Sequence, residues 1–415
     1  MTHSLVWHPF TQHGLDDDIP LIARAEGAWL YGADGRQWLD CISSWWVTTH
    51  GHGHPKIMAA IRAQTVKLDQ LIFAGWTHEP AETLARALVS LVPDPLNYAF
   101  FSDSGSTSVE VALKMALGFW RNRGETRHKI VVMEHSYHGD TIGAMSVGAR
   151  GVYNAAYAPL LFDVVRVPFP ERAGQNTLDA LEAACRDPHT AAFIVEPLIL
   201  GAGGMLIYPA SILAEMRAIC VRHHVLFIAD EVMTGWGRTG TLFACEQAGV
   251  TPDLMCLSKG LTGGAIPLAV TLASDAIYDA HRTPHRADMF YHSSSYTANP
   301  IACAAANANL TIWRDEPVLA RVATLAEQQE TYLAALTHPA LINQRQCGTI
   351  TAMEIASDTP GYLDDIGPRL ASEFRNRGLL LRPMGNTLYV MPPYCIAVEE
   401  LDQIYTAVAD VIGGP

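Results

Sequence analysis

Asp230 and Lys259 are the residues best suited to carry chemistry, and each follows a short apolar run. The runs, residues 225–229 and 254–257, are uninterrupted, which is typical of strands that are buried on both faces of a parallel sheet. Such sheets present functional side chains at the carboxyl ends of their strands. We therefore expect the carboxylate and the amine to face one crevice.

A lysine and a carboxylate in one crevice suit the chemistry of pyridoxal phosphate. The lysine amine can hold this cofactor as a Schiff base, and the carboxylate can keep the pyridine nitrogen protonated, so that the ring acts as an electron sink. The lysine must also move protons, which requires burial or nearby positive charge to lower the pKa of its amine. Aspartates end strands in many α/β enzymes, so this pair alone does not identify a pyridoxal phosphate site. Other stretches of the sequence have to support it.

The segment SDSGS, residues 102–106, is the second informative stretch, because an apolar run precedes it and a helix is expected to follow at once. Thr107 and Glu110 have the spacing of a capping box. The amino terminus of a helix binds anions through free N–H groups and its dipole, and glycine lets the backbone approach closely. An ordinary helix cap without a ligand is the alternative. The candidates for a phosphate site are Ser104, Gly105 and Ser106.

Two further stretches carry candidates for contacts in the same crevice. Tyr137 follows the apolar run 129–133 and could stack on a cofactor ring, with His138 as its rival. Arg382 interrupts one of two apolar strands expected in residues 377–394. Its guanidinium therefore needs a carboxylate partner, from the protein or from a substrate.

The amino-terminal part is rich in aromatic and histidine residues. It begins without a regular period, and Phe10 favours a strip that is laid over a site rather than a mobile tail. Of the pair Trp45-Trp46, one is expected to line a pocket. The histidines of HGHGH, residues 50–54, have no carboxylate or cysteine nearby in sequence to complete a metal site. We expect them to cap the following helix, residues 55–69, and we predict no metal site.

Apolar runs recur along the chain with helical stretches between many of them. Strands that alternate with helices build a doubly wound α/β sheet, here of about seven strands. A chain of 415 residues also suggests a second, smaller domain. The sequence becomes more helical and polar near residue 310, where we place the boundary between the two domains. The runs begin near residues 98, 129, 163, 191, 225, 253 and 268.

Composition and charge exclude several classes of function. The formal net charge of −14 argues against binding to nucleic acid or to anionic membranes. Eight scattered cysteines without a C-x-x-C motif fit reduced thiols in the cytoplasm. We see no signal peptide and no apolar run of membrane length. Apolar residues make up 49% of the chain and charged residues 17%, which suggests that surface is buried between subunits.

One motif points to a different class of enzyme. Residues 235–240, GWGRTG, match the dinucleotide-binding pattern G-x-G-x-x-G and follow a strand. In that pattern the strand enters the first glycine directly and a helix opens at the last one. Here five residues intervene, and the residues after Gly240 start a helix poorly. We expect the glycines and Arg238 to form the wall of a loop instead.

Taken together, these stretches resemble the class III aminotransferases, a family of fold-type I pyridoxal phosphate enzymes, over almost the whole chain. The resemblance implies a large domain with a mostly parallel seven-stranded sheet and a smaller α+β domain. It implies three parts, at residues 1–60, 61–310 and 311–415. The matching segments are WHPFTQH, SSWW, SDSGSTSVEVALKMA, YHGDTIGAMSVG, EPLILGAGGM, ADEVMTGWGRTG, SKGLTGG, TANPIACAAA and MPPY.

Carried over position by position, the resemblance implies roles for individual residues. Lys259 would be the Schiff-base lysine, Asp230 the partner of the ring nitrogen, and Tyr137 a catalytic residue stacked on the ring. Gly105 and Ser106 would bind the phosphate. In a homodimer, Ser294 and Ser295 would reach the phosphate of the neighbouring subunit. The substrate contacts implied are Phe10, Trp45, Tyr137, Lys259, Ser293, Arg382 and Tyr394, with Arg238 and Asp140 as weaker candidates.

The resemblance also implies the substrates. The donor would be S-adenosylmethionine and the acceptor 7-keto-8-aminopelargonate, a keto acid of biotin biosynthesis whose carboxylate Arg382 would hold. Two departures from the family pattern affect the site: Phe10 stands where tyrosine is usual, and Ser293-Ser294-Ser295 replaces Gly-Pro-Thr. The alternatives are another ω-amine with pyruvate or 2-oxoglutarate as partner, a dinucleotide oxidoreductase, and a cofactor-binding regulator without turnover.

Overall fold

The fold is built around a seven-stranded sheet in the order β4-β12-β11-β10-β7-β5-β6. The computed structural model describes residues 4–15, 19–171 and 174–413. Strand β12 runs antiparallel to both neighbours and every other pairing is parallel, so the sheet is mostly parallel as predicted. Its strands are β4 (Tyr98–Ser102), β5 (Lys129–Met133), β6 (Val165–Val167), β7 (Thr190–Val195), β10 (Leu226–Asp230), β11 (Leu254–Leu257) and β12 (Ala269–Ala273).

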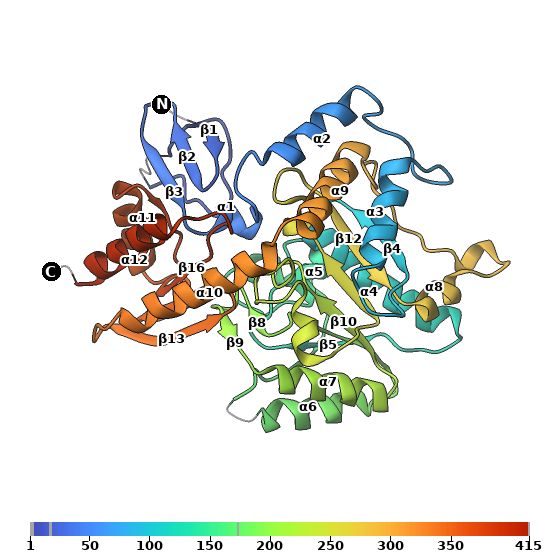
Figure 1. Ribbon diagram of the computed structural model, residues 1–415. Coiled ribbons are helices and arrows are strands. Elements are labelled where there is room, and N and C mark those ends of the chain that lie inside the picture. The colour runs from blue at the N-terminus through green and yellow to red at the C-terminus, as the bar shows by residue number, and fades with distance from the viewer. Residues whose placement is uncertain (1–3, 16–18, 172–173, 414–415) are drawn as a thin grey trace.

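Helices cover both faces of this sheet, which explains why its strands are apolar on both sides (Figure 1). Ile228 of β10 packs in one cluster with α4 (Gly105–Asn122), α5 (Ile142–Ser146) and α8 (Asp275–His281). The neighbouring Phe227 points to the other face, toward α6 (Gln175–Cys185) and α7 (Ala210–Arg222). On that second face α3 (Glu79–Val89) and α9 (Pro300–Asp315) cover β11 and β12. This arrangement is the doubly wound sheet that the sequence predicts.

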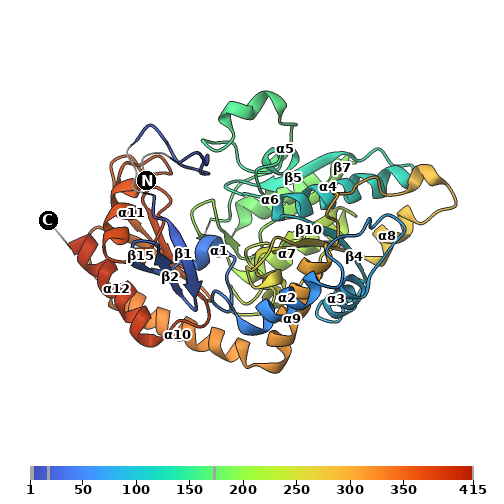
Figure 2. The ribbon, with the colours of Figure 1, turned by 90° about the horizontal axis from the view of Figure 1, so that it is seen from above.

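The two ends of the chain come together in a second cluster of elements, seen side by side in both views (Figures 1 and 2). Strand β15 (Leu379–Leu380) joins the amino-terminal β1 (Ile22–Glu26), β2 (Trp29–Gly32) and β3 (Gln37–Asp40). A separate sheet holds β13 (Leu341–Cys347), β14 (Ile350–Ile355) and β16 (Thr387–Val390). Helices α10 (Val318–Ala335), α11 (Ile366–Asn376) and α12 (Val398–Gly413) contribute to the core of this part.

The remaining elements are short or connect these two parts. Helices α1 (Ser43–Trp46) and α2 (Pro55–Thr65) follow the amino-terminal strands, and α2 packs along α9. Strands β8 (Ile199–Leu200) and β9 (Leu206–Ile207) form a small ribbon. Four short 3₁₀ helices complete the described part of the fold: η1 (Ala155–Leu160), η2 (Ala244–Ala248), η3 (Lys259–Thr262) and η4 (Arg286–Asp288). No helix in the described part of the chain is long and apolar enough to cross a membrane.

Three local predictions are wrong. The helix expected over residues 55–69 ends at Thr65, and its N-cap residue His54 makes no side-chain capping bond. The capping box of α4 lies between Ser104 and Thr107, one turn before the predicted pair. Two strands are present in residues 377–394 as expected, in different sheets, but Arg382 follows the first of them rather than interrupting it.

Candidate active site

A cavity of about 320 Å³ lies at the carboxyl ends of the parallel strands, between the sheet and the elements formed by the two chain ends. It brings together predicted residues that are up to 372 positions apart in the sequence, from Phe10 to Arg382. The His138 and Asp140 side chains also line it. The predicted residues on its wall are Phe10, Trp45, Gly105, Ser106, Tyr137, Asp230, Lys259 and Arg382.

Asp230 ends β10 and is buried at the base of this cavity. Its Oδ1 accepts a hydrogen bond from the backbone N–H of Val232 (3.1 Å). Its Oδ2 lies 2.7 Å from Nδ1 of the buried His138. Because a carboxylate oxygen accepts, we assign the proton to Nδ1 of the imidazole. His138 thus contacts the aspartate rather than competing with Tyr137 for the place of a stacking ring.

Lys259 follows β11 after one residue, as the first residue of η3. Its φ of +46° places it in the left-handed region, which costs a residue with a side chain about 1–2 kcal/mol. Its Nζ lies 4.6 Å from the centre of the Trp46 ring. Burial is the main cause that lowers the pKa of this amine to about 8, Arg238 lowers it further, and Asp230 and Glu196 oppose the shift. A partly unprotonated amine at neutral pH is what a proton carrier needs.

Glu196 also lines the cavity, although sequence reasoning did not propose it as a site residue. It directly follows β7, and its two carboxylate oxygens accept the backbone N–H groups of Tyr137 and Gly201, both at 3.0 Å. Burial raises the pKa of this carboxyl to about 7. The signal that could have found it is the one that found Asp230, an acidic residue at the end of a buried strand.

The amino terminus of α4 forms the candidate anion site. Ser104 caps it by accepting the N–H of Thr107 (3.2 Å), and the threonine hydroxyl accepts the N–H of Ser104 (2.9 Å). A Cβ on Gly105 would lie 2.6 Å from Cγ1 of Val232, so any larger residue would force the helix or Val232 to shift. Ser106 Oγ accepts the N–H of Asp140 (3.1 Å), which ties the helix start to the loop after β5. The structure thus places two candidates, Gly105 and Ser106, on the cavity wall.

Glu110, the predicted capping residue, serves the next helix instead. Its Oε1 accepts hydrogen bonds from Thr141 Oγ1 (2.6 Å) and from the N–H of Gly143 (2.8 Å) at the start of α5. The prediction failed because Thr107 suits both the first and the last position of a capping box. The helix begins one turn earlier than the pattern suggested.

An aromatic cluster surrounds Arg382 on the cavity wall. Its guanidinium carbon lies 4.8 Å from the centre of the Trp45 ring and 5.6 Å from that of Phe10. Its Nη2 donates to the hydroxyl of Tyr362 (3.3 Å), which packs against Tyr153 with ring centres 4.6 Å apart. Within residues 4–15, 19–171 and 174–413, no carboxylate forms an ion pair with this arginine. A carboxylate of a ligand can therefore take that place.

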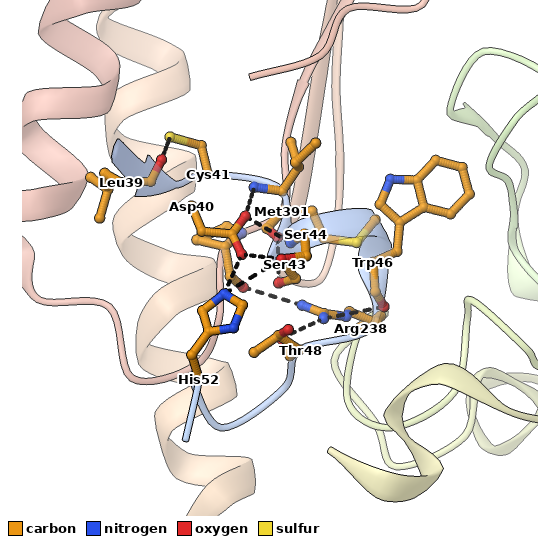
Figure 3. A network of polar contacts seen from close by, with 12 residues as sticks. Leu39, Asp40, Cys41, Ser43, Ser44, Trp46, Thr48, His52, Arg238 and Met391 are labelled. Atoms are coloured by element: carbon orange, nitrogen blue, oxygen red, sulfur yellow. Dashed lines mark hydrogen bonds and ion pairs between the residues drawn. The ribbon is translucent and has the colours of Figure 1, made fainter. Parts of the chain in front are cut away.

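The segment that carries the two tryptophans is held from both sides (Figure 3). The Asp40 carboxylate accepts the N–H of Ser44 (2.7 Å) and lies 2.8 Å from Nε2 of His52. Arg238 donates to the backbone carbonyls of Thr48 (3.0 Å), Pro392 (3.1 Å) and Trp46 (3.4 Å). These bonds fix an irregular turn in which Ser43, Ser44 and Trp46 have positive φ.

Because of this irregular turn, both tryptophans line the cavity, whereas a single one was expected. Trp45 is partly exposed beside Arg382. Trp46 is buried, and its Nε1 donates to the hydroxyl of Tyr389 (3.0 Å). The expectation assumed regular backbone, in which adjacent side chains point to different sides.

The four other predicted site residues lie elsewhere in this chain. Tyr394 is buried behind the cavity, and its hydroxyl donates to the backbone carbonyl of Trp236 (2.6 Å). The segment Ser293-Ser294-Ser295 lies before α9, where Ser294 Oγ donates to Asp103 (2.6 Å) and the carbonyl of Ser295 accepts from Gln70. None of the four lines the cavity of its own chain. Their predicted contacts with substrate or with the phosphate of a neighbouring subunit stay predictions.

The glycine motif at residues 235–240 forms a loop without a helix at its end, as expected. The next helical segment is η2, and Glu231 holds it by accepting the N–H groups of Ala244 (3.0 Å) and Cys245 (2.8 Å). A dinucleotide site would need a helix that opens at the last glycine. Within the described ranges, no group of three or more His, Cys, Asp or Glu side chains is arranged to hold a metal ion. All eight cysteines are free thiols.

The residues on the cavity wall fit pyridoxal phosphate by their chemistry. Asp230 supplies a buried carboxylate for the ring nitrogen, and Lys259 supplies an amine with a lowered pKa for the aldehyde. Gly105 and Ser106 supply a helix amino terminus for the phosphate. Val232 and Tyr137 also line the cavity and can enclose the ring. The ring nitrogen, the aldehyde and the phosphate of the cofactor thus each have a suitable residue on the wall.

Comparisons with known proteins agree with this fit. The family described as aminotransferase class-III matches residues 12–412. A protein of Synechococcus elongatus, named adenosylmethionine-8-amino-7-oxononanoate aminotransferase, is 47% identical over 99% of both chains. A crystal structure of an enzyme of the same name from Methanocaldococcus jannaschii has a TM-score of 0.95 and 32% identity, and it covers 99% of this chain and 97% of its own.

A pyridoxal-phosphate-bound amine transaminase from an uncultivated Pseudomonas species is also similar, with a TM-score of 0.91 and 31% identity over 99% of both chains. These matches confirm the predicted fold-type I architecture. Since the family match spans nearly the whole chain, and since the cavity offers residues suited to the ring nitrogen, the aldehyde and the phosphate of its cofactor, the chain belongs to the class III aminotransferases, which depend on pyridoxal phosphate.

Proposed function

We propose that this enzyme transfers the amino group of S-adenosylmethionine to 7-keto-8-aminopelargonate and so makes 7,8-diaminopelargonate for biotin. The observation that carries the proposal is the full-length similarity to relatives that bear the name of this aminotransferase, at 47% identity in the first case. Arg382 supports it from the structure, because its guanidinium lies in an aromatic cluster on the cavity wall without a carboxylate of its own among the described residues. A keto acid with an apolar chain suits such a place.

Lys259 is the residue proposed to move protons. When bound, pyridoxal phosphate supplies an electron sink, which makes the proton on the amine-bearing carbon acidic. The Nζ atom of Lys259 would take that proton from the amine-bearing carbon of the donor and pass it to the cofactor, which also keeps the amino group. In the second half of the reaction it would carry the proton back, to the carbon of the acceptor that receives the amino group. A pKa of about 8 leaves Nζ able to act in both directions near neutral pH.

The other cavity residues are proposed to bind and orient. Asp230, backed by His138, would pair with the ring nitrogen, and the amino terminus of α4 would hold the phosphate. Arg382 binds the carboxylate of the keto acid, while Phe10 and Trp45 pack on its chain and on the nucleoside of the donor. Phe10 has no hydroxyl, so it contributes packing but no hydrogen bond. Tyr137 completes the wall.

A second copy of the chain is the proposed partner. Ser294 and Ser295 lie outside the cavity of their own chain, which suits the predicted contact with the phosphate of a neighbouring subunit. Exposed apolar side chains lie within a few positions of these serines and of Gln70 in the sequence, and Gln70 joins the two stretches by donating to the Ser295 carbonyl. A dimer would bury this apolar surface. The exposed residues are Val66, Ile72, Trp76, Tyr291 and Tyr296.

The proposed location is the cytoplasm, supported by eight free cysteines, of which six are buried. The predicted division into parts at residues 1–60, 61–310 and 311–415 also stays a proposal. The hydrophobic cores support this division. Residues from both ends of the chain form one core, whereas the seven-stranded sheet and its helices form separate cores.

The nearest alternative is an aminotransferase that uses another ω-amine with pyruvate or 2-oxoglutarate. The similarity to an amine transaminase of known structure favours it. All cofactor residues would be the same, and only the substrate end of the cavity would differ.

A panel of amino donors separates the two possibilities. The purified enzyme, loaded with pyridoxal phosphate, is mixed with one donor at a time, and the loss of the visible absorbance of the cofactor reports the first half-reaction. We expect S-adenosylmethionine to react, and 7-keto-8-aminopelargonate to restore the absorbance. If the enzyme reacts with β-alanine or ornithine but not with S-adenosylmethionine, the proposed donor is wrong and the alternative function is supported.

A further inference from the structure

The turn that begins with Lys259 is held by a buried side chain that does not line the cavity. Asn309, on α9, is fully buried, and its Nδ2 donates to the backbone carbonyls of Gly260 and Leu261, both at 3.0 Å. These are the two residues directly after the lysine. One amide thus fixes the turn that aims Nζ into the cavity.

A second side chain fixes the orientation of this amide. Because Nδ2 of Asn309 donates to two carbonyls, its Oδ1 must be the acceptor in the bond to His50 Nε2, which is 2.9 Å long. The imidazole therefore carries its proton on Nε2. Burial lowers the pKa of His50 to about 4, so it remains neutral at working pH and keeps donating. His50, Asn309 and the lysine turn form a chain of directed bonds.

The turn also depends on close packing that leaves little room for adjustment. A Cβ on Gly260 would lie 2.7 Å from Cβ of Trp236, and one on Gly263 would lie 2.7 Å from Ile57 and 3.3 Å from Asn309 Oδ1. Gly263 has a φ of +66° and Lys259 a φ of +46°. Glycine adopts this left-handed conformation freely, but lysine does not, so the surroundings have to hold Lys259 in it.

We propose that Asn309 and His50 are positioning residues, which hold the turn after Lys259 so that its amine stays aimed at the aldehyde of the cofactor. Neither side chain touches the cavity, so neither acts on substrate or cofactor directly. His50 comes from the amino-terminal loop and Asn309 from α9. The orientation of the Lys259 side chain thus depends on how the loop that carries His50 and helix α9 pack against the sheet.

The test uses the apoenzyme and two ligands, and it needs no substrate. Pyridoxal phosphate is captured covalently by Lys259, and the visible absorbance follows the rate. Pyridoxine phosphate has an alcohol in place of the aldehyde and cannot bond to the lysine, so its affinity reports the rest of the cavity. We expect Asn309→Ala to slow covalent capture by about tenfold or more, since a small misplacement of a reacting group has effects of that size. The affinity for pyridoxine phosphate is expected to remain within about twofold of that of the unaltered protein.

Two sets of variants complete the test. Asn307→Ala is the matched control, because Asn307 lies on the same helix and donates to the carbonyl of Pro80, away from the turn. His50→Leu removes the donor and is expected to slow capture, whereas His50→Gln offers a donor at a similar reach and should restore most of the rate. The His50 pair decides the question if Asn309→Ala does not fold.

The proposal is overturned if Asn309→Ala and His50→Leu capture pyridoxal phosphate as fast as Asn307→Ala does. It is equally overturned if capture and pyridoxine phosphate affinity fall together, because the residues would then support the whole cavity. The inference rests on the assignment of Lys259 as the cofactor lysine. It is independent of the amino donor, since no donor is used, and a wrong donor assignment would leave these results unchanged.

Discussion

Lys259 is the residue on which the proposed reaction depends most. We expect Lys259→Ala to abolish turnover and the visible absorbance of the bound cofactor, because no other amine lines the cavity formed by the described residues. Far-ultraviolet circular dichroism should be unchanged, since Lys259 belongs to a short turn and the variant removes little beyond the contact of its amine with the Trp46 ring. A variant that keeps its activity or its absorbance would show that another lysine holds the cofactor.

The amine of Lys259 should also give the enzyme a defined pH dependence. Its pKa of about 8 means that the reactive, unprotonated form grows as the pH rises. The rate at which the apoenzyme captures pyridoxal phosphate should therefore rise about tenfold per pH unit below pH 8 and become constant above it. Stopped-flow absorbance measures this profile.

Glu196 provides a check on that profile, because its negative charge raises the pKa of Lys259. Glu196→Gln should shift the midpoint below that of the unaltered protein. Glu125→Gln is the control, since it removes the same charge from a surface pair with Arg127. A midpoint that stays in place or rises in Glu196→Gln would contradict the assigned electrostatics.

The sequence predicts the chemical role of a single residue better than it predicts which side chains contact that residue in the fold. Asp230 and Lys259 could be found because each follows an apolar run. The contacts around Arg382 could not, since Phe10 and Trp45 reach it from the other end of the chain. Left-handed backbone at Trp46 and Lys259 was equally invisible, because tertiary contacts impose it on residues that do not prefer it.

At the scale of elements, the start of α4 shows how closely a helix and a loop must approach to form the anion site. A methyl group on Gly105 would collide with Val232, which lines the same cavity. Such overpacking costs about 1–3 kcal/mol, so we expect Gly105→Ala to weaken the binding of pyridoxal phosphate about ten- to a hundredfold. Equilibrium titration of the apoenzyme measures the dissociation constant.

Gly151→Ala is a suitable control for this substitution, because a Cβ there would meet no atom within 4 Å. It should bind the cofactor as the unaltered protein does. Equal affinities in Gly105→Ala and the unaltered protein would mean that the helix and Val232 can move apart, and that close approach is not needed.

Elements were predictable where one periodic signal decides their structure. All seven strands of the large sheet appear because most of their residues are apolar; β5, β7, β10, β11 and β12 are buried almost throughout, whereas β4 and β6 are only partly buried. The ends of helices were less predictable: Thr107 fits two positions of a capping box, and only the packed structure shows which one it takes. The partners of β15 and β16 could not be predicted, because they come from β3 and β14, distant in sequence.

The whole molecule poses the question of how many chains make one site. The cavity contains the predicted cofactor residues of one chain, but Ser294 and Ser295 lie outside it. If a second copy supplies them, each site combines Lys259 of one subunit with Ser295 of the other. Exposed apolar side chains beside this segment are the surface that such a dimer would cover.

Mixed dimers test this arrangement directly. Lys259→Ala removes the amine of one chain, and Ser295→Glu places a negative charge where the phosphate of the partner's cofactor is expected. Each variant alone should be inactive. A dimer with one chain of each kind, purified through two different tags, contains one intact site of two, so we expect about half of the normal activity. A mixed dimer of Lys259→Ala with Asp230→Ala is the control and should be inactive, because both residues belong to the cavity of their own chain. If the first mixed dimer is as inactive as this control, Ser295 acts within its own subunit; if Ser295→Glu alone keeps its activity, Ser295 acts at neither phosphate. Either result means that the shared site has to be abandoned.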